Sequence, residues 1–205
     1  MTRAFANIAF TPAVRQEQAK RGSAAFNDRF LEPDAPPANR IGPDETAFIA
    51  QRDGFYQATV SETGWPYVQF RGGPRGFLKV LDESTIAYSD YRGNRQHVSA
   101  GNVNADGRVS LILMDYPNQR RLKLFGRARL SDDNDLITRL HDETYKARPE
   151  RAVVIDVEAV EWNCPAHIPQ RLTVEELAPI LTPLREELEA LRAENAALKA
   201  KAIGA

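Results

Sequence analysis

The stretch GRVSLILMDYPNQRRLKLFGRARL, residues 107–130, decides the fold because it contains the patterns of two β-strands in succession. Its first half is apolar on both faces at its centre, which predicts a strand buried on both sides. Its second half alternates, with basic side chains and Phe125 on one face. The opposite face carries apolar or small residues: Leu122, Leu124, Gly126, Ala128 and Leu130.

Strand patterns continue on both sides of this stretch. Residues 54–62 and 67–73 read as a hairpin around the turn Thr63–Pro66, because they are rich in aromatic and β-branched residues. Further strands are expected over 76–82, 85–90 and 152–162, and helices over 12–22, 44–52 and 132–147. Thr11 is the expected cap of the first helix, with Pro12 at its first position. Six or seven short strands predict a mainly β protein, a small antiparallel barrel or sandwich with flanking helices.

The C-terminal segment, residues 173–205, has a seven-residue repeat typical of a coiled coil. Leucines recur at 177, 184, 191 and 198, and Leu181, Leu188 and Asn195 form a second series. With the second series at position a, Asn195 favours a parallel, two-stranded pair. Acidic residues then occupy position g and basic residues position e, which suits the same pairing: Glu187, Glu194, Arg192 and Lys199. Thr182 and Pro183 mark the expected helix start, and the alternative is one amphipathic helix packed on its own domain.

Composition excludes several classes of protein. The chain has 205 residues, 42% of them hydrophobic and 27% charged, which is ordinary for a globular domain. A net charge of −1 argues against general nucleic-acid binding. The longest apolar run is too short for a membrane span and no signal peptide is visible, so a cytoplasmic protein is expected. The single cysteine and three widely spaced histidines predict no metal site.

The stretch AYSDYRGNRQHV, residues 87–98, predicts an anion site. A strand is expected to run as far as Ser89 and to be interrupted at the following glycine. A short helix is then expected to begin with Asn94, Arg95 and Gln96. A helix N-terminus attracts anions, Asn94 is the expected cap, and Arg95 can clamp a phosphate. Further cations precede this stretch, at Arg71, Arg75 and Lys79. The alternative is an ordinary solvated basic surface.

Three segments in series resemble the pyridoxamine 5'-phosphate oxidase-like FMN-binding split-barrel family. They are residues 66–81, 85–96 and 108–130, and the resemblance extends over about 48–171. The branch it resembles is described only as flavin-nucleotide-binding. The resemblance implies a six- or seven-stranded antiparallel split β-barrel with flanking helices and a C-terminal helix. It also implies a homodimer with FMN at the subunit interface. The expected division is an N-terminal helical segment (1–53), the barrel (54–172) and the C-terminal helix (173–205).

The resemblance also implies which residues bind FMN. A strand that lines the flavin corresponds to Arg75, Gly76, Phe77, Leu78 and Lys79, and an aromatic–hydroxyl pair corresponds to Tyr88 and Ser89. The phosphate-binding turn of the family corresponds to Asn94, Arg95 and Gln96, which keep one cation and lose a lysine. Positions expected near the flavin from the partner subunit or from the last strand correspond to Arg121, Trp162 and Arg171.

Departures from the family pattern limit the expected activity. The family's Arg-Leu-His reads Arg171-Leu172-Thr173 here, and a Gln-Ser segment before the last strand is absent, so oxidation of pyridoxamine 5'-phosphate is not expected. Arg121 stands where the family has glutamine. A cation there would favour the reduced, anionic flavin, and the alternative is an exposed basic strand face.

The expected function is that of an FMN-dependent oxidoreductase. It would move electrons between a reduced nicotinamide or small organic donor and an unidentified acceptor, with the electron chemistry supplied by the cofactor. No small-molecule substrate and no catalytic residue can be named from the residues. One alternative is a non-catalytic flavin carrier or redox sensor. Another is a barrel that holds haem or a deazaflavin, with His97 or His167 as the candidate haem ligand.

Overall fold

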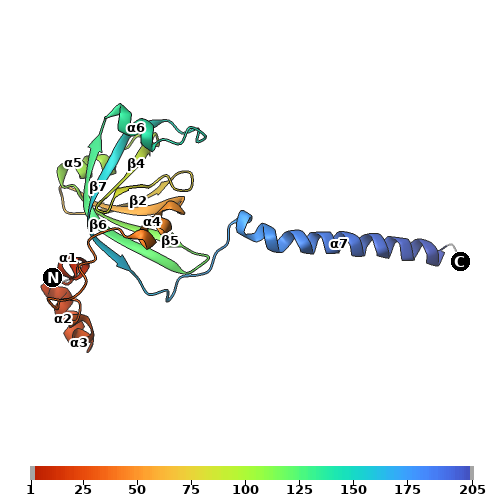
Figure 1. Ribbon diagram of the computed structural model, residues 1–205, viewed down its shortest axis with the longest axis horizontal. Helices are drawn as coiled ribbons and strands as arrows, with labels where there is room; N and C mark the ends of the chain where they lie inside the picture. The colour runs from red at the N-terminus through yellow and green to blue at the C-terminus, as the bar shows by residue number, and fades with distance from the viewer. Residues whose placement is uncertain (1–2, 204–205) are drawn as a thin grey trace. The chain divides into compact units, whose positions relative to one another are not determined.

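A computed structural model describes residues 3–203, and its chain divides into two units (Figure 1). The first unit runs up to Asp115 and from Arg120 to Ala166. The second comprises Tyr116–Gln119 and the chain from His167 onwards. The expected division of the chain at residues 53 and 172 stays a prediction.

The first unit is built on one seven-stranded antiparallel sheet. Its strand order is β2-β1-β5-β6-β7-β4-β3, so that the chain's second and third strands lie at opposite ends. The sheet curls without closing, and the split-barrel prediction is confirmed. The strands are β1 (Gly54–Val60), β2 (Pro66–Gly72), β3 (Lys79–Asp82), β4 (Thr85–Tyr91), β5 (Arg108–Asp115), β6 (Arg120–Ser131) and β7 (Pro149–Trp162).

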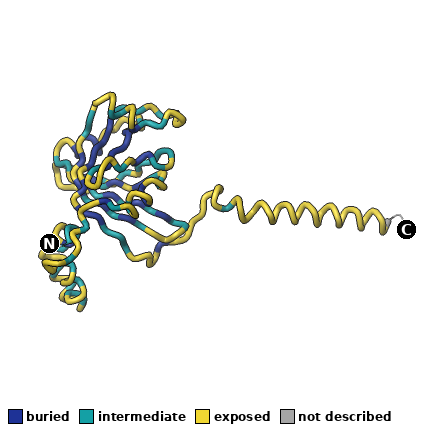
Figure 2. The backbone as a smooth tube through the Cα atoms, in the orientation of Figure 1, coloured by how far each residue is buried: buried dark blue, intermediate teal, exposed yellow. Residues whose placement is uncertain are grey.

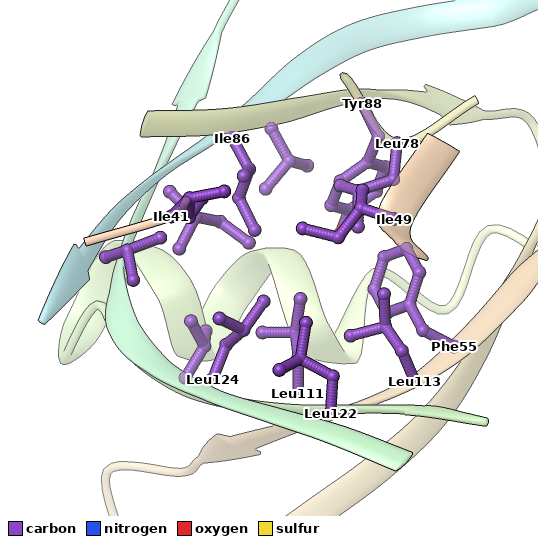
Figure 3. Packing of buried hydrophobic residues seen from close by; sticks show 14 of the residues in the cluster. Ile41, Ile49, Phe55, Leu78, Ile86, Tyr88, Leu111, Leu113, Leu122 and Leu124 are labelled. Carbon is purple, nitrogen blue, oxygen red and sulfur yellow. The ribbon is translucent and has the colours of Figure 1, made fainter. Parts of the chain in front are cut away.

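The core fills the space inside the curled sheet. Figure 3 shows Leu111 and Leu122 from one side of the curl pointing toward Ile86 and Tyr88 on the other. The alternation along β6 is confirmed, because its leucines at 122 and 124 are buried. The prediction that β5 is buried on both faces is wrong for this chain. Its face with Val109, Leu111 and Leu113 is buried, whereas Ile112 and Met114 on the outer face are half-buried.

Six short helices flank the sheet of the first unit. Thr11 caps its helix as expected, since its hydroxyl accepts a hydrogen bond of 3.4 Å from the Val14 backbone N–H. The helix expected over 132–147 ends early, at Leu140, because the Asp142 carboxylate accepts from the Thr144 N–H in a local turn. The helices are α1 (Ala4–Ala9), α2 (Pro12–Lys20), α3 (Ala24–Asp28), α4 (Pro43–Ala50), α5 (Val98–Ala105) and α6 (Asn134–Leu140).

The second unit contains one long helix, α7 (Val174–Ile203), whose described residues are mostly exposed (Figure 2). The helix begins eight residues before the expected Thr182–Pro183 start. A capping box explains this: the Thr173 N–H donates to Glu176 Oε2 at 2.8 Å, and the Glu176 N–H donates to Thr173 Oγ1 at 3.2 Å. Pro183 therefore lies inside the helix. None of the described helices has the length and apolar character that a membrane span needs.

Candidate anion-binding site

A pocket of about 70 Å³ lies where β2, β4 and the start of α5 come together. The curl of the sheet brings these elements close, since Arg71 on β2 contacts Asp90 on β4. Its lining is largely polar. The residues used below are Tyr67, Gln69, Arg71, Asp90, Arg95 and Ser99.

The β2 strand supplies one wall of the pocket. Its residues Tyr67, Gln69 and Arg71 alternate with Val68 and Phe70, so the first three share one face of the strand. That face points into the pocket, whereas Val68 and Phe70 are exposed on the other face. This alternation of polar and apolar side chains is visible in the sequence. It could have identified Arg71 as the cation that this strand contributes to the pocket.

Arg71 is the cation held most firmly in the pocket. Its Nη1 donates to Asp90 Oδ1 at 2.7 Å, and the two side chains are only 15% and 11% exposed. Asp90 Oδ2 is also 3.5 Å from Nε of Arg151, so two guanidinium groups share one carboxylate. Nε of Arg71 is buried and has no hydrogen-bond partner among residues 3–203. The two lining arginines, Arg71 and Arg95, are matched in the lining by Asp90 and Glu150. The positive charge that favours an anionic ligand therefore comes from further arginines next to the pocket, Arg151 among them.

The loop between β4 and α5 forms the outer rim, and it differs from the expected helix start. The helix begins at Val98, with His97 as the residue before it, so Asn94 does not cap it. Instead, Asn94 Oδ1 accepts a 3.1 Å hydrogen bond from the Gln96 N–H within the loop. This local hydrogen bond competes with helix formation, which is why the helix starts four residues later than Asn94.

Two residues of this loop adopt left-handed backbone conformations that are unfavourable for side-chain-bearing residues. Arg95 has φ 61° and His97 has φ 53°. Each such residue costs on the order of 1 kcal/mol and persists only where its surroundings impose it. At the base of the loop, the Ser99 hydroxyl donates to Gln69 Oε1 at 2.9 Å and joins α5 to β2. The loop is thereby held with Arg95 on the pocket wall.

A second cavity of about 450 Å³ continues from this rim and is strongly basic. It shares Arg95 and His97 with the pocket and adds three more arginines, whereas Glu150 is its one acidic lining residue. The added residues are Arg92, Arg148 and Arg151. Their combined field attracts anions toward the pocket.

The structure brings only part of the predicted site together. Asn94, Arg95 and Gln96 line the pocket, whereas Arg75 and Lys79 are exposed and do not line it. The remaining predicted residues of the first unit lie outside the lining: Gly76, Phe77, Leu78, Tyr88, Ser89, Arg121 and Trp162.

Several of these residues have structural roles inside the chain. Phe77, Leu78 and Tyr88 are at most 2% exposed, and their side chains form part of the core. Burial raises the pKa of the Tyr88 hydroxyl, so it stays protonated and donates to Gln57 Oε1 at 2.8 Å. Ser89, which is 2% exposed, lies beside Tyr91.

Gly76 allows a close approach of two backbone segments. It has φ 75°, and an added Cβ would lie 2.8 Å from the Ala50 carbonyl oxygen. The Gly76 N–H also donates to the Arg52 carbonyl oxygen at 2.8 Å, just after the end of α4.

Two of the last three predicted residues, Arg121 and Trp162, lie elsewhere in the first unit, and Arg171 belongs to the second unit. Arg121 lies on the outer face of β6, paired in register with Met114 of β5. Trp162 Nε1 donates to Glu45 Oε1 at 2.6 Å, and its ring packs edge-on against Phe48. The Arg171 guanidinium lies 4.9 Å from the centre of the Tyr116 ring.

Metal chemistry has no evident site in the part of the chain that the structure describes. Residues 3–203 contain no group of three or more histidine, cysteine, aspartate and glutamate side chains placed to hold a metal ion.

Comparisons with known proteins identify the family and the fold. The family model described as pyridoxamine 5'-phosphate oxidase matches residues 43–164. A variant of HupZ from Group A Streptococcus has a similar structure, with 15% identity, a TM-score of 0.50 and coverage of 60% of this chain and 99% of that chain. This similarity supports the fold alone.

Two further solved structures have lower TM-scores. A putative pyridoxamine 5'-phosphate oxidase from Lactobacillus delbrueckii is 22% identical, with a TM-score of 0.46 and coverage of 60% of this chain and 94% of that chain. An FMN-binding protein from Syntrophomonas wolfei is 11% identical, with a TM-score of 0.48 and coverage of 74% and 95% respectively. No curated protein shows a significant match to this chain.

Proposed function

This chain belongs to the pyridoxamine 5'-phosphate oxidase family, and from that membership we propose that it binds FMN with the phosphate group in the pocket between β2 and β4. The observation that carries the proposal is the pair of lining arginines, Arg71 and Arg95, next to a strongly basic cavity. A phosphate monoester carries about two negative charges and several strong acceptor oxygens at neutral pH, which matches this donor set.

The size of the pocket fits this assignment. A volume of about 70 Å³ accommodates one phosphate group and not a whole nucleotide. The sugar and the ring system would extend outward over the surface, where they need further contacts. Tyr67 and Gln69 are positioned to orient the part of the ligand next to the phosphate, because they share a strand face with Arg71.

A second copy of the chain is the proposed source of those further contacts. The outer face of β1, β2 and β5 carries an apolar patch in which Tyr56, Val68 and Phe70 are 40%, 59% and 58% exposed. Tyr56 and Phe70 pack edge to face across the two strands. Arg121 borders this patch through its register partner Met114. Burying the patch in a homodimer would remove apolar surface from water and bring Arg121 to the partner.

Oxidoreductase activity is the proposed role of the bound cofactor. FMN, when bound, supplies hydride and single-electron transfer, and the chain's residues bind and orient it. Thr173 stands where the family's substrate-binding histidine is expected, so pyridoxamine 5'-phosphate is not the proposed substrate. The electron donor is proposed to be a reduced nicotinamide or a small organic molecule. A non-catalytic flavin carrier is the second candidate.

Identification of the chromophore is the direct test. We expect the purified protein to be yellow and to release FMN on denaturation, as measured by absorbance and chromatography. Because the phosphate would use the buried arginine, FMN should bind at least about 100-fold more tightly than riboflavin, a difference of about 3 kcal/mol.

The other outcomes of this test favour the alternatives. Equal affinity for FMN and riboflavin would contradict the phosphate assignment. Binding of haem instead, with a spectrum that changes in His97→Ala, would favour the haem alternative, because His97 lines the pocket. Steady turnover with a reduced nicotinamide would argue against a passive carrier.

Arg121→Gln should make the reduction potential of the bound flavin more negative by about 30 mV or more. A cation near the flavin stabilises the negative charge of the reduced form, and 30 mV corresponds to a tenfold change for a two-electron couple. Lys123→Gln is the matched control, because it removes the same charge two residues away on the same face of β6. Equal shifts in the two variants, or none in Arg121→Gln, would contradict a specific role for Arg121.

A further inference from the structure

We propose that α7 pairs with α7 of a second copy as a parallel, in-register, two-stranded coiled coil. This assigns a partner to the second unit and does not depend on which cofactor the first unit binds. The starting observation is a row of exposed leucines along the helix. Their exposed fractions run from 38% to 58%, at Leu181, Leu184, Leu188, Leu191 and Leu198.

The early start of the helix extends the seven-residue repeat. With Leu181 at position a, Val174 also falls on a and Leu177 on d. Apolar residues then occupy every a and d position from 174 to 198 except Asn195. A helix of 30 residues is about 45 Å long, enough for four full heptads in one seam. Burying these leucines against identical residues removes a continuous apolar stripe from water.

Asn195 indicates how many helices the coiled coil contains and in which register they pair. A single asparagine at position a is best accommodated against its own counterpart in a two-stranded coil, where the two amides hydrogen-bond to each other. A shift of register by one heptad would leave one amide opposite Leu188 and the other opposite Ala202, both without a polar partner. The cost of a buried unpaired amide therefore selects the in-register dimer.

The charges beside the seam select the parallel orientation. In a parallel coil, position g of one helix faces position e of the other, five residues further along. Glu187 then faces Arg192 of the second copy, and Glu194 faces Lys199 of the second copy. In an antiparallel coil, g faces g and e faces e, so glutamates would oppose glutamates.

The two prolines inside α7 are compatible with this seam. Pro179 falls on position f and Pro183 on position c, both on the outer side of the coil. Each proline lacks an N–H and leaves one carbonyl without its helical hydrogen bond. On the outer face, water can bind those carbonyls, and gentle helix bending leaves the outer side convex. The seam positions themselves remain free of proline.

Cysteine cross-linking of the full-length chain tests the pairing. In a Cys164→Ser background, Leu184→Cys and Leu198→Cys each place a thiol at position d, and Ala193→Cys places one at position f. Only a parallel, in-register coil brings each d-position thiol next to its own copy. We expect each d-position variant to form the interchain disulfide at least ten times faster than the Ala193→Cys variant under mild oxidation.

Three outcomes would overturn the proposal. Similar slow rates at all three positions would show that α7 has no fixed partner, even if the barrels themselves form a dimer. Faster linking in a mixture of the Leu181→Cys and Leu198→Cys chains than in either alone would show an antiparallel pair, because position a faces position d in that orientation. Non-covalent assemblies larger than dimers, detected by light scattering of the same variants, would show that α7 associates in higher oligomers.

Charge reversal gives a second, independent test. Glu187→Lys with Glu194→Lys places like charges across the seam and should slow cross-linking of Leu184→Cys by about tenfold. Adding Arg192→Glu and Lys199→Glu restores the complementarity and should restore the rate. Failure of this rescue, with the cofactor content of the barrel unchanged, would contradict the proposed orientation without bearing on cofactor binding.

Discussion

Arg71→Gln is expected to weaken FMN binding by about 100-fold or more. The substitution removes a guanidinium that is only 15% exposed and that lines the pocket. Losing a hydrogen-bonded charge from a desolvated site costs about 2–5 kcal/mol of binding free energy. Titration of the apoprotein with FMN, followed by quenching of flavin fluorescence, measures the loss.

Arg75→Gln is the matched control for Arg71→Gln. Arg75 lies four residues further along the chain, but it is exposed and does not line the pocket. We expect its FMN affinity to stay within about threefold of the natural protein, because exposed charges contribute little. A large loss at Arg75 with none at Arg71 would contradict the pocket and favour the correspondence implied by family resemblance.

Asp90→Asn tests whether Arg71 acts through its own charge or through its ion pair with Asp90. It removes the negative charge 2.7 Å from Arg71 Nη1 but keeps the guanidinium in the pocket. If the charge of Arg71 holds the phosphate, Asp90→Asn should retain most of the FMN affinity. If both variants lose binding equally and unfold at lower temperature, the ion pair acts by holding the β2 and β4 strands together.

Gly126→Val is expected to lower the free energy of unfolding by about 3 kcal/mol. An added Cβ at this position would lie 2.5 Å from the Asp156 carbonyl oxygen and 2.9 Å from Cγ2 of Ile155. The register between β6 and β7 shifts at this glycine, so backbone would have to move to make room. For a domain of this size the loss corresponds to a drop in Tm of about 6–12 °C.

Gly101→Ala provides the contrasting control. Gly101 lies inside α5, and a Cβ there would meet no atom within 4 Å. Alanine is the better helix former by about 0.8–1 kcal/mol, so this variant should unfold at the same or a slightly higher temperature. Thermal unfolding followed by circular dichroism compares both variants, and an unchanged Tm for Gly126→Val would contradict the steric argument.

Local sequence patterns determined the elements of this fold. The alternation from Arg121 to Leu130 predicted β6 and its buried face, because the period of two is a property of any strand. Thr11 and Pro12 predicted the start of α2 through hydrogen bonding within one turn. Where two local signals competed, the prediction was wrong: the Thr182–Pro183 signal was overridden by the capping box at Thr173.

The pocket was decided only by tertiary structure. Arg71 and Asp90 are nineteen residues apart and meet because the sheet curls and brings β2 to β4. Glycines at 72 and 73 and Pro74 interrupt the strand alternation, so the pattern alone did not exclude Arg75. The sequence thus determined which strands and helices form, since their signals lie within a few residues. Which cations converge depends on contacts between strands distant in the chain, which local patterns do not encode.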